Sequence, residues 1–264
     1  MTVNADPTEP QQVLFPDALS PDALAPEPLL PEAPSPAGVP SPEVLSPDEL
    51  LTTTRSVRRR LDPSRPLDLA LVKECVEIAQ QAPNGGNTQR WHWLVVADPE
   101  LRCRIAAVYR RAFEARNPPA DLPAGPPPAT PEQGAHARMM ASGRHLADRL
   151  HEIPVLVIPC LRLSGKGLPE GSQAGLWGSL LPAAWSYMLA ARARGLGTAW
   201  TTAHLDAEQE VAALLGLPED VRQGALIPTA HVLGDGFRPA PRRPVESVLH
   251  LDGWDGAWGG GLDD

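Results

Sequence analysis

Arg55, Ser56 and Arg58 are the first residues along the chain whose types and spacing could do chemistry. Guanidinium groups donate forked hydrogen bonds that match the oxygens of a phosphate, and their charge offsets that of the anion. A solvated basic surface is the competing interpretation, and the adjoining Arg59 and Arg60 fit it. Taken alone, this motif favours the solvated surface.

A second group of polar residues forms the segment Pro83-Asn84-Gly85-Gly86-Asn87-Thr88-Gln89. Paired glycines let backbone approach a flat ligand closely. Asn and Gln amides offer donors and acceptors to a ring edge that carries C=O and N–H groups. An ordinary Asn/Gly turn is the alternative, but the length of the segment and its number of amides favour a ligand-binding loop. It lacks the Gly-Lys-Ser/Thr of a Walker loop.

The elements that must position these groups alternate between helices and strands. Periodicity and capping residues predict helices over 49–54, 68–82, 98–113, 136–151, 175–194 and 206–215, the last of them with Asp206 as its N-cap. Apolar runs predict strands over 91–96, 153–161, 197–201 and 224–233. In the second helix, we expect Leu71, Cys75, Ile78 and Ala82 to face the core. The alternation indicates an α/β or α+β class.

Three further motifs follow the two above in sequence order: Gly195-Leu196-Gly197-Thr198-Ala199-Trp200-Thr201-Thr202, Leu226-Ile227-Pro228 and Pro241-Arg242-Arg243-Pro244. With them, the chain from Glu49 to Trp254 resembles the nitroreductase-like FMN-dependent oxidoreductases. The resemblance implies an α+β fold, a sandwich whose central mixed, mainly antiparallel sheet is flanked by helices. It also implies an intertwined homodimer with one FMN at each of two interface sites.

The resemblance further implies roles for individual residues. Arg55, Ser56 and Arg58 would hold the phosphate and ribityl chain of FMN, and Arg242, or failing it Arg243, would complete the phosphate site. Other cofactor contacts are implied at Pro83, Asn84, Gly85, Gly86, Asn87 and Gln89, at Thr201 and Thr202, and at Ser179, Leu180 and Pro182 of the partner subunit. Trp200 and His204 are candidates for the substrate pocket, although an ordinary hydrogen-bonded histidine accounts for His204 equally well.

The implied activity is a ping-pong reaction. NADPH or NADH passes hydride to flavin N5, and a small oxidised acceptor of the nitroaromatic or quinone type is then reduced, with no catalytic side chain required. Two alternatives stay open. One is a flavin-binding or flavin-sequestering protein without turnover, whose flavin is covered by the proline-rich loop 117–131 or by the N-terminal tail. The other is an FMN-dependent oxidase or dehydrogenase of a peptide-derived substrate.

Composition separates the N-terminal tail from the rest. Residues 1–50 hold twelve prolines and nine acidic residues but no Lys or Arg, so the net charge of −9 belongs to them and the remainder is formally neutral. We therefore expect a disordered, proline-rich acidic tail over 1–48 and an FMN-binding domain over 49–264. A neutral domain without a basic stripe argues against nucleic acid as a partner.

The remaining composition argues against metals and membranes. Three cysteines and the scattered histidines show no metal-ligand spacing, and the odd cysteine count fits a reduced, cytoplasmic protein. The apolar stretch 176–191 is short for a membrane span and contains serine and proline. We expect it to be a buried helix of the core or of a dimer interface.

Overall fold

The computed structural model describes residues 45–118, 130–165, 167–256 and 258. Residues 1–44 of the predicted tail and residues 119–129 of the predicted loop lie outside this part. No helix among the described residues is long and apolar enough to cross a membrane.

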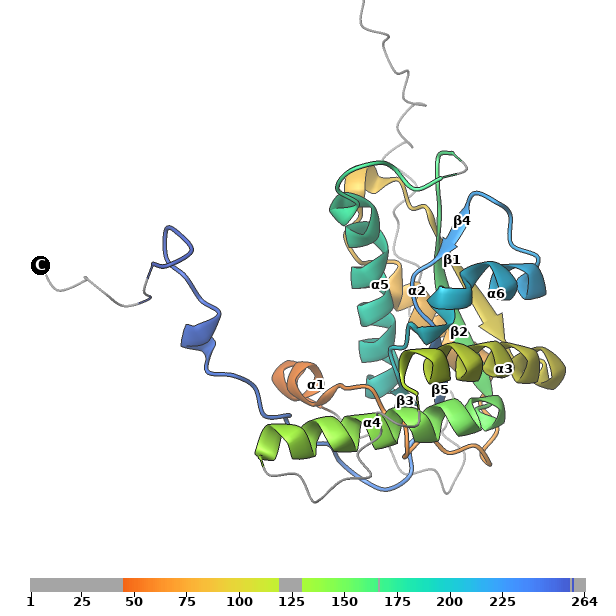
Figure 1. Ribbon diagram of the computed structural model, residues 1–264, viewed down its shortest axis with the longest axis horizontal. Helices are drawn as coiled ribbons and strands as arrows, with labels where there is room; N and C mark the ends of the chain where they lie inside the picture. The colour runs from red at the N-terminus through yellow and green to blue at the C-terminus, as the bar shows by residue number, and fades with distance from the viewer. Residues whose placement is uncertain (1–44, 119–129, 166, 257, 259–264) are drawn as a thin grey trace, which may run out of the picture. The chain divides into compact units, whose positions relative to one another are not determined.

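A single five-stranded sheet forms the centre of the described domain (Figure 1). Its strands are β1 (Trp91–Val96), β2 (Val155–Arg162), β3 (Leu196–Thr198), β4 (Val221–Gln223) and β5 (Ile227–His231). The order is β1-β2-β5-β3, with β4 paired to β2, and all of these pairings are antiparallel. Ser56 adds a parallel bridge to Thr198. The mixed, mainly antiparallel sheet is therefore confirmed.

Helices cover both faces of this sheet. They are α1 (Pro47–Thr53), α2 (Leu69–Ala79), α3 (Pro99–Arg116), α4 (Pro131–Arg149), α5 (Ala174–Ala193) and α6 (Glu208–Leu215). Short 3₁₀ helices occur at η2 (Gly85–Asn87), η4 (Leu150–Glu152), η5 (Ala203–Ala207) and η6 (Val245–Ser247).

The alternation of side chains along β2 explains the two layers. Leu156 and Ile158 pack into one cluster with residues of α3, α4 and α6, whereas Val155 and Val157 pack into a second cluster with residues of α2 and α5. Successive residues of a strand point to opposite faces, so an apolar run without polar interruptions is buried on both sides. The sandwich follows from that run.

The buried face of α2 differs from the prediction. Val72, Cys75 and Ala79 are its buried residues, whereas Ile78 is 43% exposed. The helix ends at Ala79, before Ala82, so the expected spacing combined residues of the helix with one of the following turn. Cys75 and Ala82 are buried as predicted, whereas Val72 and Ala79 are buried in place of Leu71 and Ile78.

The predicted N-cap at Asp206 is also wrong. Residues 203–207 form η5, and α6 begins at Glu208 without a side-chain cap. The Asp206 carboxylate instead binds the Arg116 guanidinium of α3 through two hydrogen bonds. The carboxylate thus makes two hydrogen bonds to a guanidinium in place of one to a backbone N–H at the helix start.

Candidate functional site

The segment 55–58 is fixed on the sheet next to β3. The Val57 N–H donates to Thr198 O over 2.7 Å, and the Ser56 hydroxyl oxygen accepts from the Trp200 N–H over 3.0 Å. Val57 is buried in the core, and Arg55 and Arg58 are half-buried. The two arginines therefore extend from a backbone that is held on both sides.

Arg55 lines an open cleft of about 800 Å³ at the turn that follows β5. Its guanidinium donates to Arg238 O over 2.6 Å. Arg60 and Arg238 line the same cleft, which contains one carboxylate, that of Asp235. Three arginines and one aspartate line the cleft, so their net charge gives it a positive potential that favours anions.

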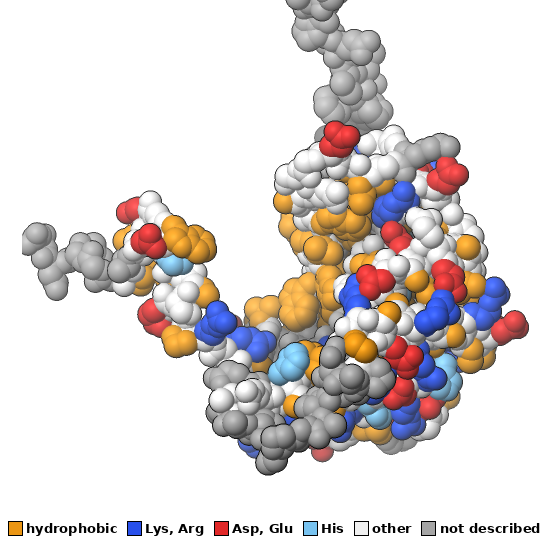
Figure 2. All heavy atoms as spheres, viewed as in Figure 1, with side chains coloured by type: hydrophobic (Ala, Val, Ile, Leu, Met, Phe, Trp, Pro, Cys, Tyr) orange, Lys and Arg blue, Asp and Glu red, His pale blue; other side chains and the backbone are white. Residues whose placement is uncertain are grey.

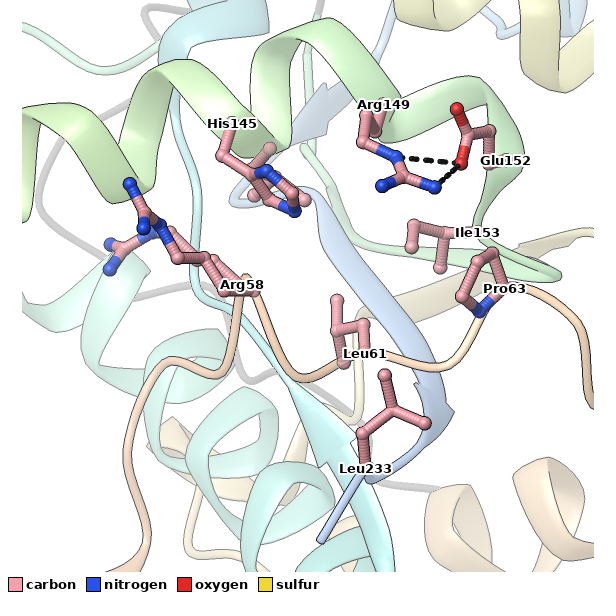
Figure 3. A pocket seen from close by; sticks show the side chains of 10 residues that line it. Arg58, Leu61, Pro63, His145, Arg149, Glu152, Ile153 and Leu233 are labelled. Carbon is pink, nitrogen blue, oxygen red and sulfur yellow. Dashed lines mark hydrogen bonds and ion pairs between the residues drawn. The ribbon is translucent and has the colours of Figure 1, made fainter.

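Arg58 lines a second hollow, a cavity of about 110 Å³ against α4 (Figure 3). His145 and Arg149 contribute to it from successive turns of α4, because residues four apart share a helix face. Arg149 donates to Glu152 over 2.8 Å, and this hydrogen bond lowers the pKa of the Glu152 carboxyl. Leu61 and Ile153 supply apolar wall. The cavity thus combines cationic and apolar surface.

The sequence did not single out His145 and Arg149. Their spacing on a predicted helix was visible, but nothing in the sequence placed that helix opposite Arg58. We name residues 55–58, together with the cleft and the cavity that they line, the arginine end of the site.

The loop over 84–89, which we name the amide loop, lies elsewhere. Its backbone bends through positive φ angles at Gly86 (60°), Asn87 (52°) and Gln89 (47°). Asn84 Oδ1 accepts from the Gln89 N–H over 3.0 Å, and Gln89 Nε2 donates to Asn87 Oδ1 over 3.1 Å. Glycine and asparagine tolerate this left-handed conformation, whereas for Gln89 it is uncommon and marks a constrained position.

The amide loop packs on the N-terminal half of α5. Its Gly85 N–H donates to Ser179 Oγ over 3.0 Å, and Thr88 and Gly175 border the same small hollow. The arginine end instead adjoins β3, which follows the C-terminus of α5. From Ser179 to Ala193 a helix rises about 21 Å. The chain by itself therefore does not bring the amide loop and the arginine end together (Figure 1).

The segment after β3 is more buried than expected. Thr201 Oγ1 donates to Leu226 O over 2.7 Å inside the core, while Trp200 and Thr202 are half-buried. His204 is 0% exposed, so it does not line an open pocket of the protomer. Its two ring nitrogens have no hydrogen-bond partner among the described residues, and burial lowers its pKa to about 4. The assignment of His204 to the substrate pocket stays a prediction, for a side chain that this chain alone already buries.

Three other predicted contacts also differ in exposure. The Leu180 side chain is fully buried against Trp91 and Leu161, so it stabilises its own core and does not face a partner or a ligand. Pro182 is half-buried and lies two residues further along α5, about half a turn away. Arg242 is exposed and donates to its neighbour Pro241 O, not to a group of the arginine end.

Comparison with known proteins gives three kinds of match. The model of the Nitroreductase family matches residues 51–231. Iodotyrosine deiodinase of Drosophila melanogaster is 35% identical over 60 residues, which are 23% of this chain and about a fifth (21%) of that protein. A variant of the FMN and NADPH-dependent nitroreductase NfnB from a sphigopyxis strain has a similar structure, with a TM-score of 0.59, 21% identity and coverage of 80% of this chain and 100% of that chain.

Two further solved structures share the fold. Oxidised iodotyrosine deiodinase bound to FMN and 3-iodo-L-tyrosine has a TM-score of 0.56 at 23% identity, covering 75% of this chain and 95% of that chain. A BluB-like flavoprotein from Clostridium difficile 630 has a TM-score of 0.56 at 19% identity, covering 78% and 99%. Since the family match spans more than half of the sequence and the structures share its architecture, this chain belongs to the nitroreductase family and has the nitroreductase fold.

Proposed function

We propose that this protein binds FMN and reduces small oxidised acceptors, of the nitroaromatic or quinone type, with NADPH or NADH. The observation that carries the proposal is the arginine end. There, one fixed backbone segment directs Arg55 to an open basic cleft and Arg58 to a smaller cavity that is both cationic and apolar.

The residues present fit the chemistry of FMN. A phosphate monoester carries close to two negative charges, and the cleft offers the guanidiniums of Arg55, Arg60 and Arg238 against one carboxylate. A flavin ring is apolar with a polar edge. The small cavity that Arg58 shares with His145 has apolar walls and a cationic rim, which suit one edge of such a ring but not the whole ring. The amide loop adds side-chain amides that are donors and acceptors for such an edge.

The site that we propose is shared between two copies of the chain. The arginine end and the amide loop lie toward opposite ends of α5, so neither copy can surround one flavin with both. A homodimer in which the amide loop of one protomer meets the arginine end of the other brings the two sets together twice. The protein would then hold two equivalent flavins.

Exposed apolar surface supports the dimer. Leu181 and Trp185, four residues apart on α5, are both more than a third exposed, and hydrophobic side chains gather along this helix (Figure 2). Val248 and Trp254 of the C-terminal segment are also exposed, Trp254 by 81%. Large contiguous apolar patches on a folded domain mark interaction surfaces. A second copy would cover these groups.

In this proposal FMN, when bound, supplies hydride acceptance and donation. The protein binds and orients the cofactor. The positive charge of Arg58 would stabilise negative charge on the part of the cofactor that faces it. Thiol chemistry is disfavoured at the buried cysteines, because burial raises the pKa of Cys75 to about 11 and that of Cys160 to about 12. Both remain protonated near neutral pH.

Subunit complementation tests the shared site. Arg58→Ala damages the arginine end, and Gln89→Ala combined with Asn84→Ala damages the amide loop. We expect each variant alone to bind FMN weakly. We expect a mixed dimer, isolated with two different tags, to bind one FMN tightly, because one of its sites combines the two undamaged halves. Mixed dimers that bind FMN no better than either parent would contradict the proposal.

A second acceptor class follows from the similarity to iodotyrosine deiodinase. In that alternative, two electrons and a proton replace a carbon–iodine bond with a carbon–hydrogen bond and release iodide. The discriminating experiment supplies the reduced protein with a nitroaromatic compound, a quinone or 3-iodotyrosine under anaerobic conditions. Faster reoxidation by 3-iodotyrosine than by the other two would favour dehalogenation.

A further inference from the structure

The aromatic ring of Phe237 lies between two arginines of different elements. The Arg60 Cζ is 4.4 Å from the ring centroid, and the Arg192 Cζ is 4.8 Å from it. Arg60 follows the segment 55–58, and Arg192 belongs to the last turn of α5. Guanidinium groups at these distances are attracted to the face of an aromatic ring. Phe237 therefore ties the turn after β5 to both neighbours.

Arg60 also shapes that turn through hydrogen bonds. Its guanidinium donates to the carbonyls of Leu233, Gly236 and Asp235 over 2.6, 2.9 and 3.2 Å. Gly234 and Gly236 have φ angles of 71° and 56°, which L side chains rarely adopt, and so allow the carbonyls to converge. The turn is thus folded around one side chain, with Phe237 stacked on it.

The next residue connects the turn to the proposed phosphate site. Arg238 O, directly after Phe237, accepts the 2.6 Å hydrogen bond from Arg55 Nη2. A guanidinium has five N–H donors in a rigid plane, so fixing one of them sets the direction of the others. The position of the Arg238 carbonyl therefore determines how Arg55 faces the basic cleft.

We propose that Phe237 is a positioning residue for Arg55. Held between Arg60 and Arg192, it fixes the Arg238 carbonyl, and through that carbonyl it orients the Arg55 guanidinium toward the phosphate of the cofactor. The role rests on the proposed FMN function. It needs no contact between Phe237 and the flavin, and it makes Phe237 important for the phosphate but not for the ring.

Riboflavin, which is FMN without its phosphate, separates these two contributions. We expect Phe237→Leu to raise the dissociation constant of FMN about tenfold, a partial loss of a charge-assisted interaction, and to leave that of riboflavin unchanged. Flavin fluorescence quenching measures both constants. Phe237→Tyr keeps the ring and should keep the FMN affinity. Unchanged riboflavin binding also reports that the variant is folded.

A double-mutant cycle tests whether the effect passes through Arg55. If it does, Phe237→Leu weakens FMN binding in the wild type but causes no further loss in an Arg55→Gln background. Phe113→Leu is the matched control, because Phe113 also lies under an arginine, Arg144, at 5.3 Å but belongs to α3 and not to the turn after β5. The control should change the FMN and riboflavin constants by the same factor.

The outcomes are distinct. Equal weakening of FMN and riboflavin by Phe237→Leu, an unchanged FMN constant, or additive losses in the cycle would overturn the role of Phe237 and leave the FMN proposal intact. A wild-type protein that binds neither ligand would overturn the FMN proposal itself, and the positioning role with it. A selective, non-additive loss of FMN affinity would support both.

Discussion

Arg58 is the side chain whose removal tests the arginine end most simply. We predict that Arg58→Ala weakens FMN binding by about 1.5–3 kcal/mol, the usual scale for hydrogen bonds to charged groups. Equilibrium dialysis of apoprotein with FMN gives the dissociation constant. Arg104→Ala, which deletes an exposed arginine side chain of α3, is the matched control. If the FMN dissociation constant is the same in both variants, Arg58 is not part of the site.

His204 predicts a pH dependence of stability. Burial first, and then the charge of Arg116, lowers its folded-state pKa to about 4 from an ordinary value of 6.5. Between these two values the unfolded chain binds the proton and the folded chain does not, so stability falls as pH decreases. Because of His204, the free energy of unfolding measured in urea should be lower by about 2 kcal/mol at about pH 5 than at neutral pH.

A variant isolates this contribution. His204→Leu cannot bind the proton, so its free energy of unfolding should fall less than that of the wild type over the same pH range. Subtracting the variant's change in free energy of unfolding with pH from that of the wild type cancels the contributions of the other titrating groups. His231 is one of these groups, and burial lowers its pKa as well. Parallel pH profiles for the two proteins would show that His204 titrates normally in the folded state.

At the scale of elements, two helix caps and the bounds of β1 follow from local sequence, whereas β4 (Val221–Gln223) was not predicted. Ser46 accepts from the Glu49 N–H, and Asp98 accepts from the Leu101 N–H, as capping residues do. β1 occupies the predicted residues, 91–96. Asp206 failed as a predicted cap because its partner Arg116 lies 90 residues away. Contacts of that range are invisible to any local pattern.

Gly197 tests the support of segment 55–58. A Cβ at this position would lie 2.9 Å from Val232 Cγ2, 3.0 Å from Leu61 Cδ2 and 3.3 Å from Val57 Cβ. We predict that Gly197→Ala destabilises the fold by about 1–3 kcal/mol, as overpacking does, and also weakens FMN binding because it displaces the segment. Gly165→Ala, in open space, is the control. Equal urea midpoints would contradict this account.

At the scale of the whole molecule, sequence motifs identified both halves of the candidate site but not their separation. Arg55 and Arg58 and the amide loop could be recognised from residue type and order alone. Their placement toward opposite ends of α5 depends on how the helix lies across the sheet, which no short motif encodes. In the proposed dimer, the partner subunit supplies the amide loop as well as the α5 residues that the resemblance implies.

Trp185 tests the dimer. We predict that Trp185→Glu, which puts a charge on the apolar face of α5, yields monomers that have lost FMN, because each monomer keeps only half of each site. Light scattering with size-exclusion chromatography, together with flavin content, measures both. Val95→Glu, at another exposed apolar position, should leave both unchanged. A monomeric Trp185→Glu protein that retains FMN would contradict the shared site.

The proposed activity is that of an FMN oxidoreductase driven by a nicotinamide cofactor. The most direct measurement is the absorbance spectrum of the purified protein, recorded before and after anaerobic addition of NADPH or NADH. We predict a flavin spectrum that bleaches and returns when a nitroaromatic or quinone acceptor is added. A bound flavin that neither NADPH nor NADH bleaches, or a colourless protein that fails to bind added FMN, would contradict the claim.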